Sequence, residues 1–122
     1  MPNYPIVSSL VIGLIALLHV YILILEMFLW DKPAGRKAFG HSQEMASLSK
    51  VLAANQGLYN GFLAAGLFWG LYLGESGFDI KVFFLGCILV AGVYGGLTAK
   101  IKIIYIQAVP AALGLALLLL KL

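Results

Sequence analysis

Four long apolar stretches, separated by short polar segments, dominate the hydrophobic pattern of the chain. Each is close to the roughly 20 residues that an α-helix needs to cross a hydrocarbon core of about 30 Å. None alternates between apolar and polar residues as the strands of a membrane barrel do. The pattern predicts an all-α fold, an integral membrane bundle of four transmembrane helices. It forms a single transmembrane domain over residues 1–122, with helices over about 6–30, 42–74, 81–99 and 103–121 and a cytoplasmic loop over about 31–41.

Composition supports this prediction, and the positions of the charges give an orientation. Of 122 residues, 62% are hydrophobic and 11% are charged, and the formal net charge is +3. Cytoplasmic loops are rich in Lys and Arg. The first and third loops therefore face the cytoplasm, both termini are non-cytoplasmic, and no separate basic module indicates a nucleic-acid partner. The cytoplasmic side carries Lys32, Arg36, Lys37, Lys50, Lys100 and Lys102, whereas the opposite side carries only Lys81 and Lys121.

The second apolar stretch carries an unusual group of polar side chains. At about 100° of rotation per helical residue, its four polar side chains fall within one arc of roughly 140° around the helix axis. Gly57 and Gly61 lie on nearly the opposite side, where glycines let neighbouring helices approach closely. This helix is therefore predicted to contact protein on two sides, and its glycine face and that of the third helix are suited to association between copies. The four polar residues are Asn55, Gln56, Tyr59 and Asn60.

Two ionisable residues share one face of the first helix. His19 and Glu26 are seven positions apart, which is a difference of only about 20° around a helix axis. A carboxylate inside a membrane helix costs roughly 2.5–3.5 kcal/mol on insertion scales, so such groups indicate a function. We predict a pocket in the cytoplasmic half of the bundle, among helices one, two and four. Its candidate acid–base groups are His19, Glu26 and Tyr59, and its candidate ligand-binding residues are Glu26, Asn55, Gln56, Tyr59, Asn60 and Gln107.

Structural roles compete with this hypothesis. Glu26 is near enough to the cytoplasmic surface to pair with Lys50 or Lys102. His19 and the amides can form hydrogen bonds between helices, each typically worth about 0.6–2 kcal/mol. The sequence contains no Gly-rich phosphate loop, no His-Glu-x-x-His and no Gly-x-Ser-x-Gly. No metal site is predicted, and no cofactor is identified.

Three segments of the sequence resemble a known family. The domain of unknown function 1304 family, a group of small bacterial four-helix membrane proteins, is similar over essentially the full length. The resemblance implies a multi-pass protein of the bacterial cytoplasmic (inner) membrane, with no settled reaction and no catalytic residue to transfer. It rests on the string 21–30 that ends Leu-Glu-Met-Phe-Leu-Trp, on the Pro33…Gly35-Arg36…Phe39-Gly40 loop, and on the Asn-Gln-Gly-Leu-Tyr-Asn-Gly string at 55–61.

Three functions remain open at this point. The first is binding, or binding and conversion, of a small amphipathic or lipid-like molecule that lies in the bilayer. The second is proton-coupled export, as in small multidrug resistance proteins, which also have four helices and one membrane glutamate. Glu26 lies closer to one face than such a glutamate should, and the charge bias argues against a dual-topology dimer. The third is a non-catalytic scaffold or partner subunit.

Overall fold

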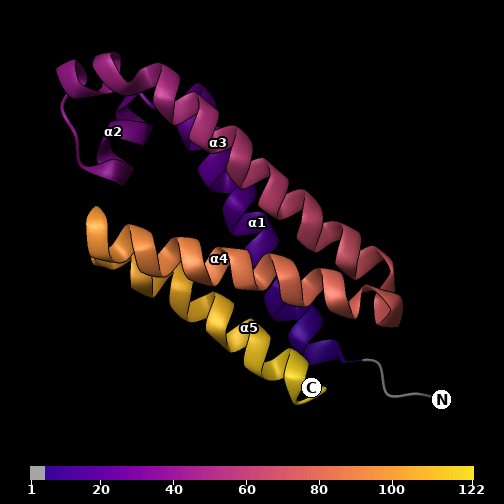
Figure 1. Ribbon diagram of the computed structural model, residues 1–122. Coiled ribbons are helices and arrows are strands. Elements are labelled where there is room, and N and C mark those ends of the chain that lie inside the picture. The colour runs from indigo at the N-terminus through magenta and orange to yellow at the C-terminus, as the bar shows by residue number, and fades with distance from the viewer. Residues whose placement is uncertain (1–4) are drawn as a thin grey trace. The chain divides into compact units, whose positions relative to one another are not determined.

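All regular elements of the described chain are helices, which confirms the all-α prediction. The computed structural model describes residues 5–122 (Figure 1). In chain order the elements are α1 (Ile6–Phe28), α2 (Pro33–Phe39), α3 (Gln43–Tyr72), the 3₁₀ turn η1 (Gly74–Gly77), α4 (Phe78–Thr98), the π-helical turn η2 (Ile104–Ala108) and α5 (Val109–Leu119).

Two helical stretches in residues 5–122 are long and apolar enough to cross a membrane. One is Ile6–Phe28, and the other is Gln43–Thr98, which contains α3, η1 and α4. A shorter apolar helix covers Ile104–Leu119. Length and composition are the basis of this assignment.

The stretch 31–41, expected from the sequence to be a loop, contains the short helix α2. Pro33 and Gly40, which break a helix in its interior, stand at the two ends of α2, and Gly35 lies buried inside it. Pro33 occupies the first turn, where a missing N–H costs nothing. Gly40 caps the C-terminus with a φ of 70°, and its N–H donates to the carbonyl of Arg36.

The last helix begins with a widened turn. Val109 N–H donates to the carbonyl of Ile104, five residues back, and the five residues before it are π-helical. Pro110 follows immediately and has no N–H to continue the ordinary ladder. The helix accommodates Pro110 by a π-turn on its N-terminal side.

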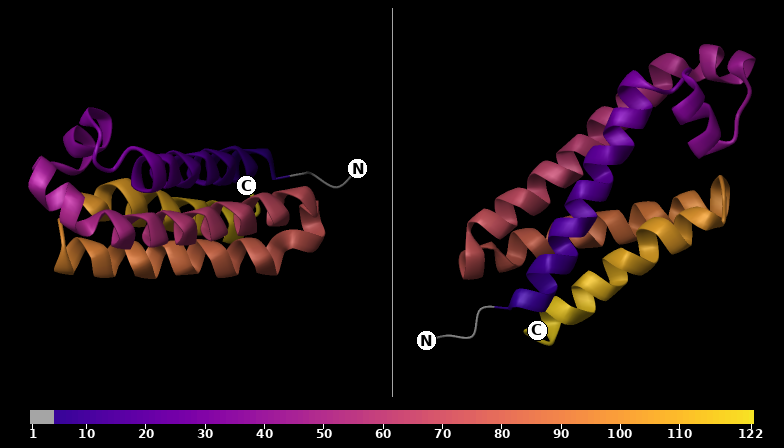
Figure 2. Two further views of the ribbon diagram at one scale, coloured as in Figure 1. Left: turned by 90° about the horizontal axis from the view of Figure 1, so that it is seen from above. Right: turned by 180° about the vertical axis from the view of Figure 1, so that it is seen from behind.

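The chain divides into two compact units. The first unit comprises the described residues up to Ala16 together with residues 65–122, and the second comprises residues 17–64. In the first unit, α4 and α5 lie side by side and run in opposite directions (Figures 1 and 2). Its buried apolar residues are Ile12, Ile15, Ala16, Leu67, Leu85, Ile88, Ala108, Ala111 and Leu118.

Close backbone approaches hold the first unit together. A Cβ added at Gly92 would lie 2.8 Å from the backbone nitrogen of Ala108. A Cβ at Gly77 would meet the carbonyl oxygen of Gly70 at the corner between α3 and α4. At this corner Lys81 is buried, and its Nζ donates to the carbonyl of Gly74 at 3.3 Å. In the sequence, Lys81 is recognisable only as a charge that bears on topology.

In the second unit, glycines on α3 pack against α1. A Cβ at Gly57 would lie 2.7 Å from Met27 Cγ and 3.0 Å from Glu26 Cβ. A Cβ at Gly61 would lie 2.6 Å from Leu23 Cδ1. The glycine face identified in the sequence therefore contacts the same chain, and it brings the α3 backbone close to Glu26.

Candidate functional site

Asn60 joins the two ionisable residues of α1 in the second unit. Its amide nitrogen donates to Glu26 Oε1 at 2.7 Å, and its amide oxygen lies 2.8 Å from His19 Nδ1. The same nitrogen donates to the backbone carbonyl of Gln56 at 3.2 Å. We call His19, Glu26 and Asn60 the buried trio.

Helical geometry explains how one side chain reaches both partners. His19 and Glu26 are two turns apart on one face of α1, about 10 Å along the axis. Asn60 lies on α3 one turn after Gly57, whose missing side chain admits α1 at Glu26. The gap between the two ionisable groups is therefore filled by the amide of Asn60.

All three residues are buried. The exposed fractions are 0% for His19, 3% for Glu26 and 9% for Asn60. Buried polar groups are normally hydrogen-bonded, and the contacts of Asn60 satisfy this rule for its own amide. One atom does not follow it, because His19 Nε2 is buried without a hydrogen-bond partner. Hydrogen bonding between helices explains the other contacts of the trio but leaves this atom unexplained.

The other predicted ligand-binding residues lie elsewhere. Asn55 is exposed, and its amide donates to Val51 O on the same helix at 2.9 Å. The Gln56 side chain is exposed, although its backbone carbonyl supports Asn60. Tyr59 is 56% exposed, and its ring contacts Phe62. Gln107 belongs to the first unit, where its amide donates to Ile88 O at 3.1 Å.

The position of Asn60 on its helix explains this separation. The buried side of α3 in the second unit includes Ala53, Gly57 and Ala64. Asn60 is at the edge of the polar arc closest to those small residues, whereas Asn55 and Tyr59 are on its far edge. The arc read from the sequence is therefore divided between a buried amide and an exposed polar surface.

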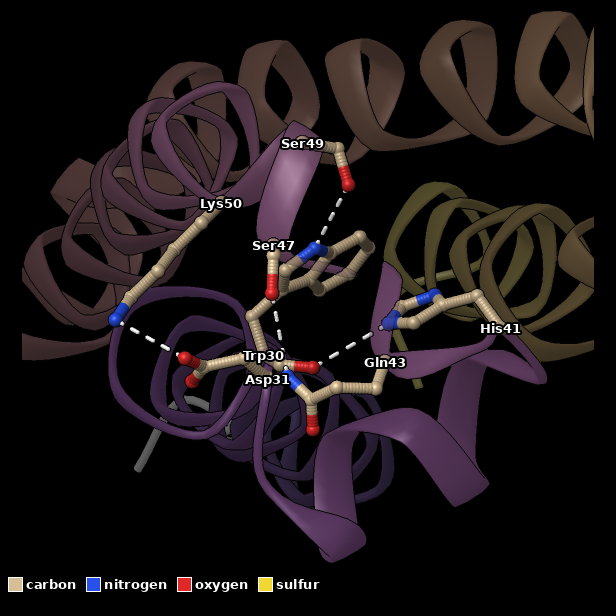
Figure 3. Close-up of polar contacts among 7 residues, drawn as sticks. All are labelled: Trp30, Asp31, His41, Gln43, Ser47, Ser49 and Lys50. Carbon is tan, nitrogen blue, oxygen red and sulfur yellow. Dashed lines mark hydrogen bonds and ion pairs between the residues drawn. The ribbon is translucent and has the colours of Figure 1, made fainter. Parts of the chain in front are cut away.

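A second polar cluster, which no sequence pattern indicated, lies at the C-terminal end of α1 (Figure 3). Trp30 Nε1 donates to Ser49 Oγ at 3.0 Å, and Ser49 Oγ donates to the carbonyl of Met45. His41 Nε2 donates to the carbonyl of Trp30 at 3.3 Å, and the two rings lie 4.2 Å apart. Phe39 packs on the same indole, so the contacts hold the ends of α2 against α1 and α3. We call this the Trp30 cluster.

Lys50 pairs with Asp31 rather than with Glu26. The distance from Lys50 Nζ to Asp31 Oδ2 is 3.1 Å (Figure 3). This hydrogen bond, with the positive charges of Lys50 and Lys32, lowers the pKa of the Asp31 carboxyl from its ordinary value. One charged partner suggested for Glu26 from the sequence is thus engaged elsewhere. No pattern in the sequence indicated this pairing.

The donor set does not match a metal centre. Within residues 5–122 there is no group of three or more His, Cys, Asp and Glu side chains placed to hold a metal ion. The trio offers one imidazole and one carboxyl group as possible metal ligands. The amide of Asn60 lies between them and is hydrogen-bonded to both. This chemistry suits recognition of a polar head group by hydrogen bonds.

The comparisons with known proteins decide the family. A model of the family "Protein of unknown function (DUF1304)" matches residues 13–119. The chain belongs to the DUF1304 family. It is also 34% identical over 104 residues to the uncharacterized protein YpaA of Lactococcus lactis subsp. lactis (strain IL1403), which covers 84% of this chain and 87% of the relative. No solved structure matches the chain. The family resemblance noted in the sequence is confirmed.

Proposed function

We propose that this DUF1304 protein is a multi-pass protein of the bacterial cytoplasmic membrane that binds the polar head of a small amphipathic molecule through the buried trio. The observation that carries the proposal is the buried His19 Nε2, which has no hydrogen-bond partner although His19 Nδ1 and the Asn60 amide are both hydrogen-bonded. A polar atom in such a position costs stability unless it receives a hydrogen bond from a bound molecule, which is either a water or a ligand.

Exposed apolar surface supports the membrane part of the proposal. Large hydrophobic side chains are exposed along the helices, for example Leu48 at 77%, Val51 at 74% and Tyr72 at 88%. A water-soluble monomer rarely exposes so many large apolar side chains, whereas a bilayer covers them. The basic residues then place α2 and the α4–α5 turn in the cytoplasm. The two termini face the other side.

The hydrogen-bond pattern favours binding over proton-coupled export. Glu26 and His19 are joined only through the amide of Asn60. An amide N–H and its carbonyl are poor proton carriers, so the acid and the base do not exchange a proton through this contact. The carboxyl group and the imidazole instead hold the amide between them in one orientation. The three groups together form a rigid polar site.

Native mass spectrometry of the purified membrane protein tests this function. The wild-type chain is expected to carry a small apolar molecule with a polar head, and the Asn60→Leu variant is expected to lose it. Asn55→Leu is the matched control, because it removes an amide from the exposed face of the same helix. Retention of the molecule by Asn60→Leu, or its absence from the wild type, would contradict the proposal.

A further inference from the structure

The amide of Asn60 has a fixed orientation. Its nitrogen carries two hydrogens, and both are used: one toward Glu26 Oε1 and one toward the backbone carbonyl of Gln56. A backbone carbonyl can only accept, so this second contact holds the NH₂ group in place whatever the protonation of Glu26. The amide oxygen must therefore be the atom that faces His19.

The orientation of Asn60 fixes the proton on His19. The Asn60 oxygen can only accept a hydrogen bond, so His19 Nδ1 donates across the 2.8 Å contact. In a neutral imidazole only one nitrogen carries hydrogen, and the other offers a lone pair. A charged imidazolium would place an N–H at Nε2 in a buried position with no acceptor, and this is costly. His19 is thus the tautomer with a bare Nε2.

Because His19 Nε2 can only accept a hydrogen bond, we infer that the trio selects ligands whose head group donates one, such as an alcohol or a phenol. The inference rests on the proposed function and names the ligand chemistry of the same site. His19 Nε2 is fully buried and can only accept, so an O–H or N–H donor satisfies it. A ketone, ester or ether head would place a second lone pair against it.

A metal ion is the other species that a bare imidazole nitrogen attracts, but the surroundings of His19 disfavour it. A metal centre needs further ligands, and residues 5–122 offer no cluster of three suitable side chains. The Glu26 oxygen that faces Asn60 already accepts a hydrogen bond from it. One donor head group satisfies Nε2 without any further residue.

The first part of the test reads the proton on His19 directly. The protein is labelled with ¹⁵N-histidine in lipid nanodiscs, and His19 is assigned with the variant His41→Gln, since the chain has two histidines. Without added ligand, Nδ1 is expected to be protonated and Nε2 bare, which their ¹⁵N shifts distinguish. Protonation at Nε2 instead would overturn the inference, whatever the protein binds.

The second part compares two matched probes, 1-hexadecanol and its methyl ether. The alcohol is expected to bind about five- to hundredfold more tightly, the range that follows from leaving one buried polar group unpaired. Binding of the alcohol alone should move the Nε2 resonance. In His19→Phe, which has no acceptor at this position, the preference between the two probes should disappear.

The outcomes separate this inference from the proposed function. Equal binding of alcohol and ether to the wild type would leave a binding protein but would overturn the donor preference. A preference for the alcohol that persists in His19→Phe would also overturn it, because a group other than His19 would then recognise the head group. Binding of neither probe would contradict the proposed function and the inference together. If His19→Phe does not fold, the wild-type comparison and the ¹⁵N tautomer still decide.

Discussion

The side-chain nitrogen of Asn60 donates a hydrogen bond of 2.7 Å to Glu26 Oε1, although the two residues are 34 positions apart. This contact joins α1 and α3 within the second unit at the turn where Gly57 admits the neighbouring helix. Several measurable consequences depend on this contact and on the packing around it.

Loss of the Asn60 amide should destabilise the fold. Asn60→Leu leaves a buried carboxyl and a buried imidazole N–H without partners, and each such group costs about 1–3 kcal/mol. Measured between membrane-protein helices, such contacts give values toward the lower end of that range. The free energy of unfolding, measured in detergent or bicelles, should fall accordingly. Asn55→Leu should stay within about 0.5 kcal/mol of wild type, and an equal loss in both variants would contradict the role given to Asn60.

Two glycines on α4 should respond oppositely to the same substitution. Gly92→Ala places a Cβ 2.8 Å from Ala108 N and 3.1 Å from Ala108 Cα, so backbone must move. We expect a loss of about 1–3 kcal/mol in the free energy of unfolding. At Gly86 an added Cβ meets nothing within 4 Å, and Ala is the better helix former by up to about 1 kcal/mol. Gly86→Ala should be neutral or stabilising, and a loss there as large as at Gly92 would count against this packing.

The Asp31–Lys50 pair should give the protein a specific response to acid. The hydrogen bond to Lys50 lowers the pKa of Asp31 from its usual value of 3.8. Stabilisation by such a group is fully present above the usual pKa and is lost as pH falls through the lowered pKa. The difference in thermal midpoint between wild type and Asp31→Asn should therefore be constant above about pH 5 and shrink in stronger acid. A difference that grows toward low pH would have the wrong sign for this pair.

The Trp30 cluster should control the order of α2. Trp30→Phe keeps an aromatic ring beside Phe39 and His41 but removes the donor to Ser49. Trp30→Ala removes both. Hydrogen–deuterium exchange at Gly40 N–H, which donates to Arg36 O, should be slowest in wild type, faster in the Phe variant and fastest in the Ala variant. Equal protection in all three proteins would show that α2 is held by other contacts.

The sequence predicts the helices well and their connection less well. Long apolar stretches determine helices by length and composition alone, so the four expected segments have counterparts in α1, α3, α4 and the η2–α5 helix. The short helix α2 was missed because Pro33 and Gly40 are helix breakers in the interior of a helix but suitable residues at its ends. Sequence alone does not say on which side of such a residue the helix lies.

The site was predictable only in part. Periodicity correctly places His19 and Glu26 on one face of α1, since it depends only on spacing along one helix. Which residue would meet them depends on how two helices pack. Helical position puts Asn60 at the edge of the arc nearest the small residues and Asn55 at the far edge, but the packing of α1 against α3 decides that the small-residue side is buried. The Asp31–Lys50 pair and the Trp30 cluster likewise arise from contacts between segments that the chain brings together only on folding.

The head-to-tail alignment of the dipoles in the buried trio has an electronic consequence. Hydrogen bonds in series polarise one another. When Glu26 is ionised, its negative charge draws the Asn60 amide electrons toward the amide oxygen, which then pulls harder on the imidazole hydrogen at Nδ1. Electron density then moves to the far side of the ring, so the state of a carboxyl group about 10 Å away along α1 sets how strong a hydrogen-bond acceptor Nε2 is.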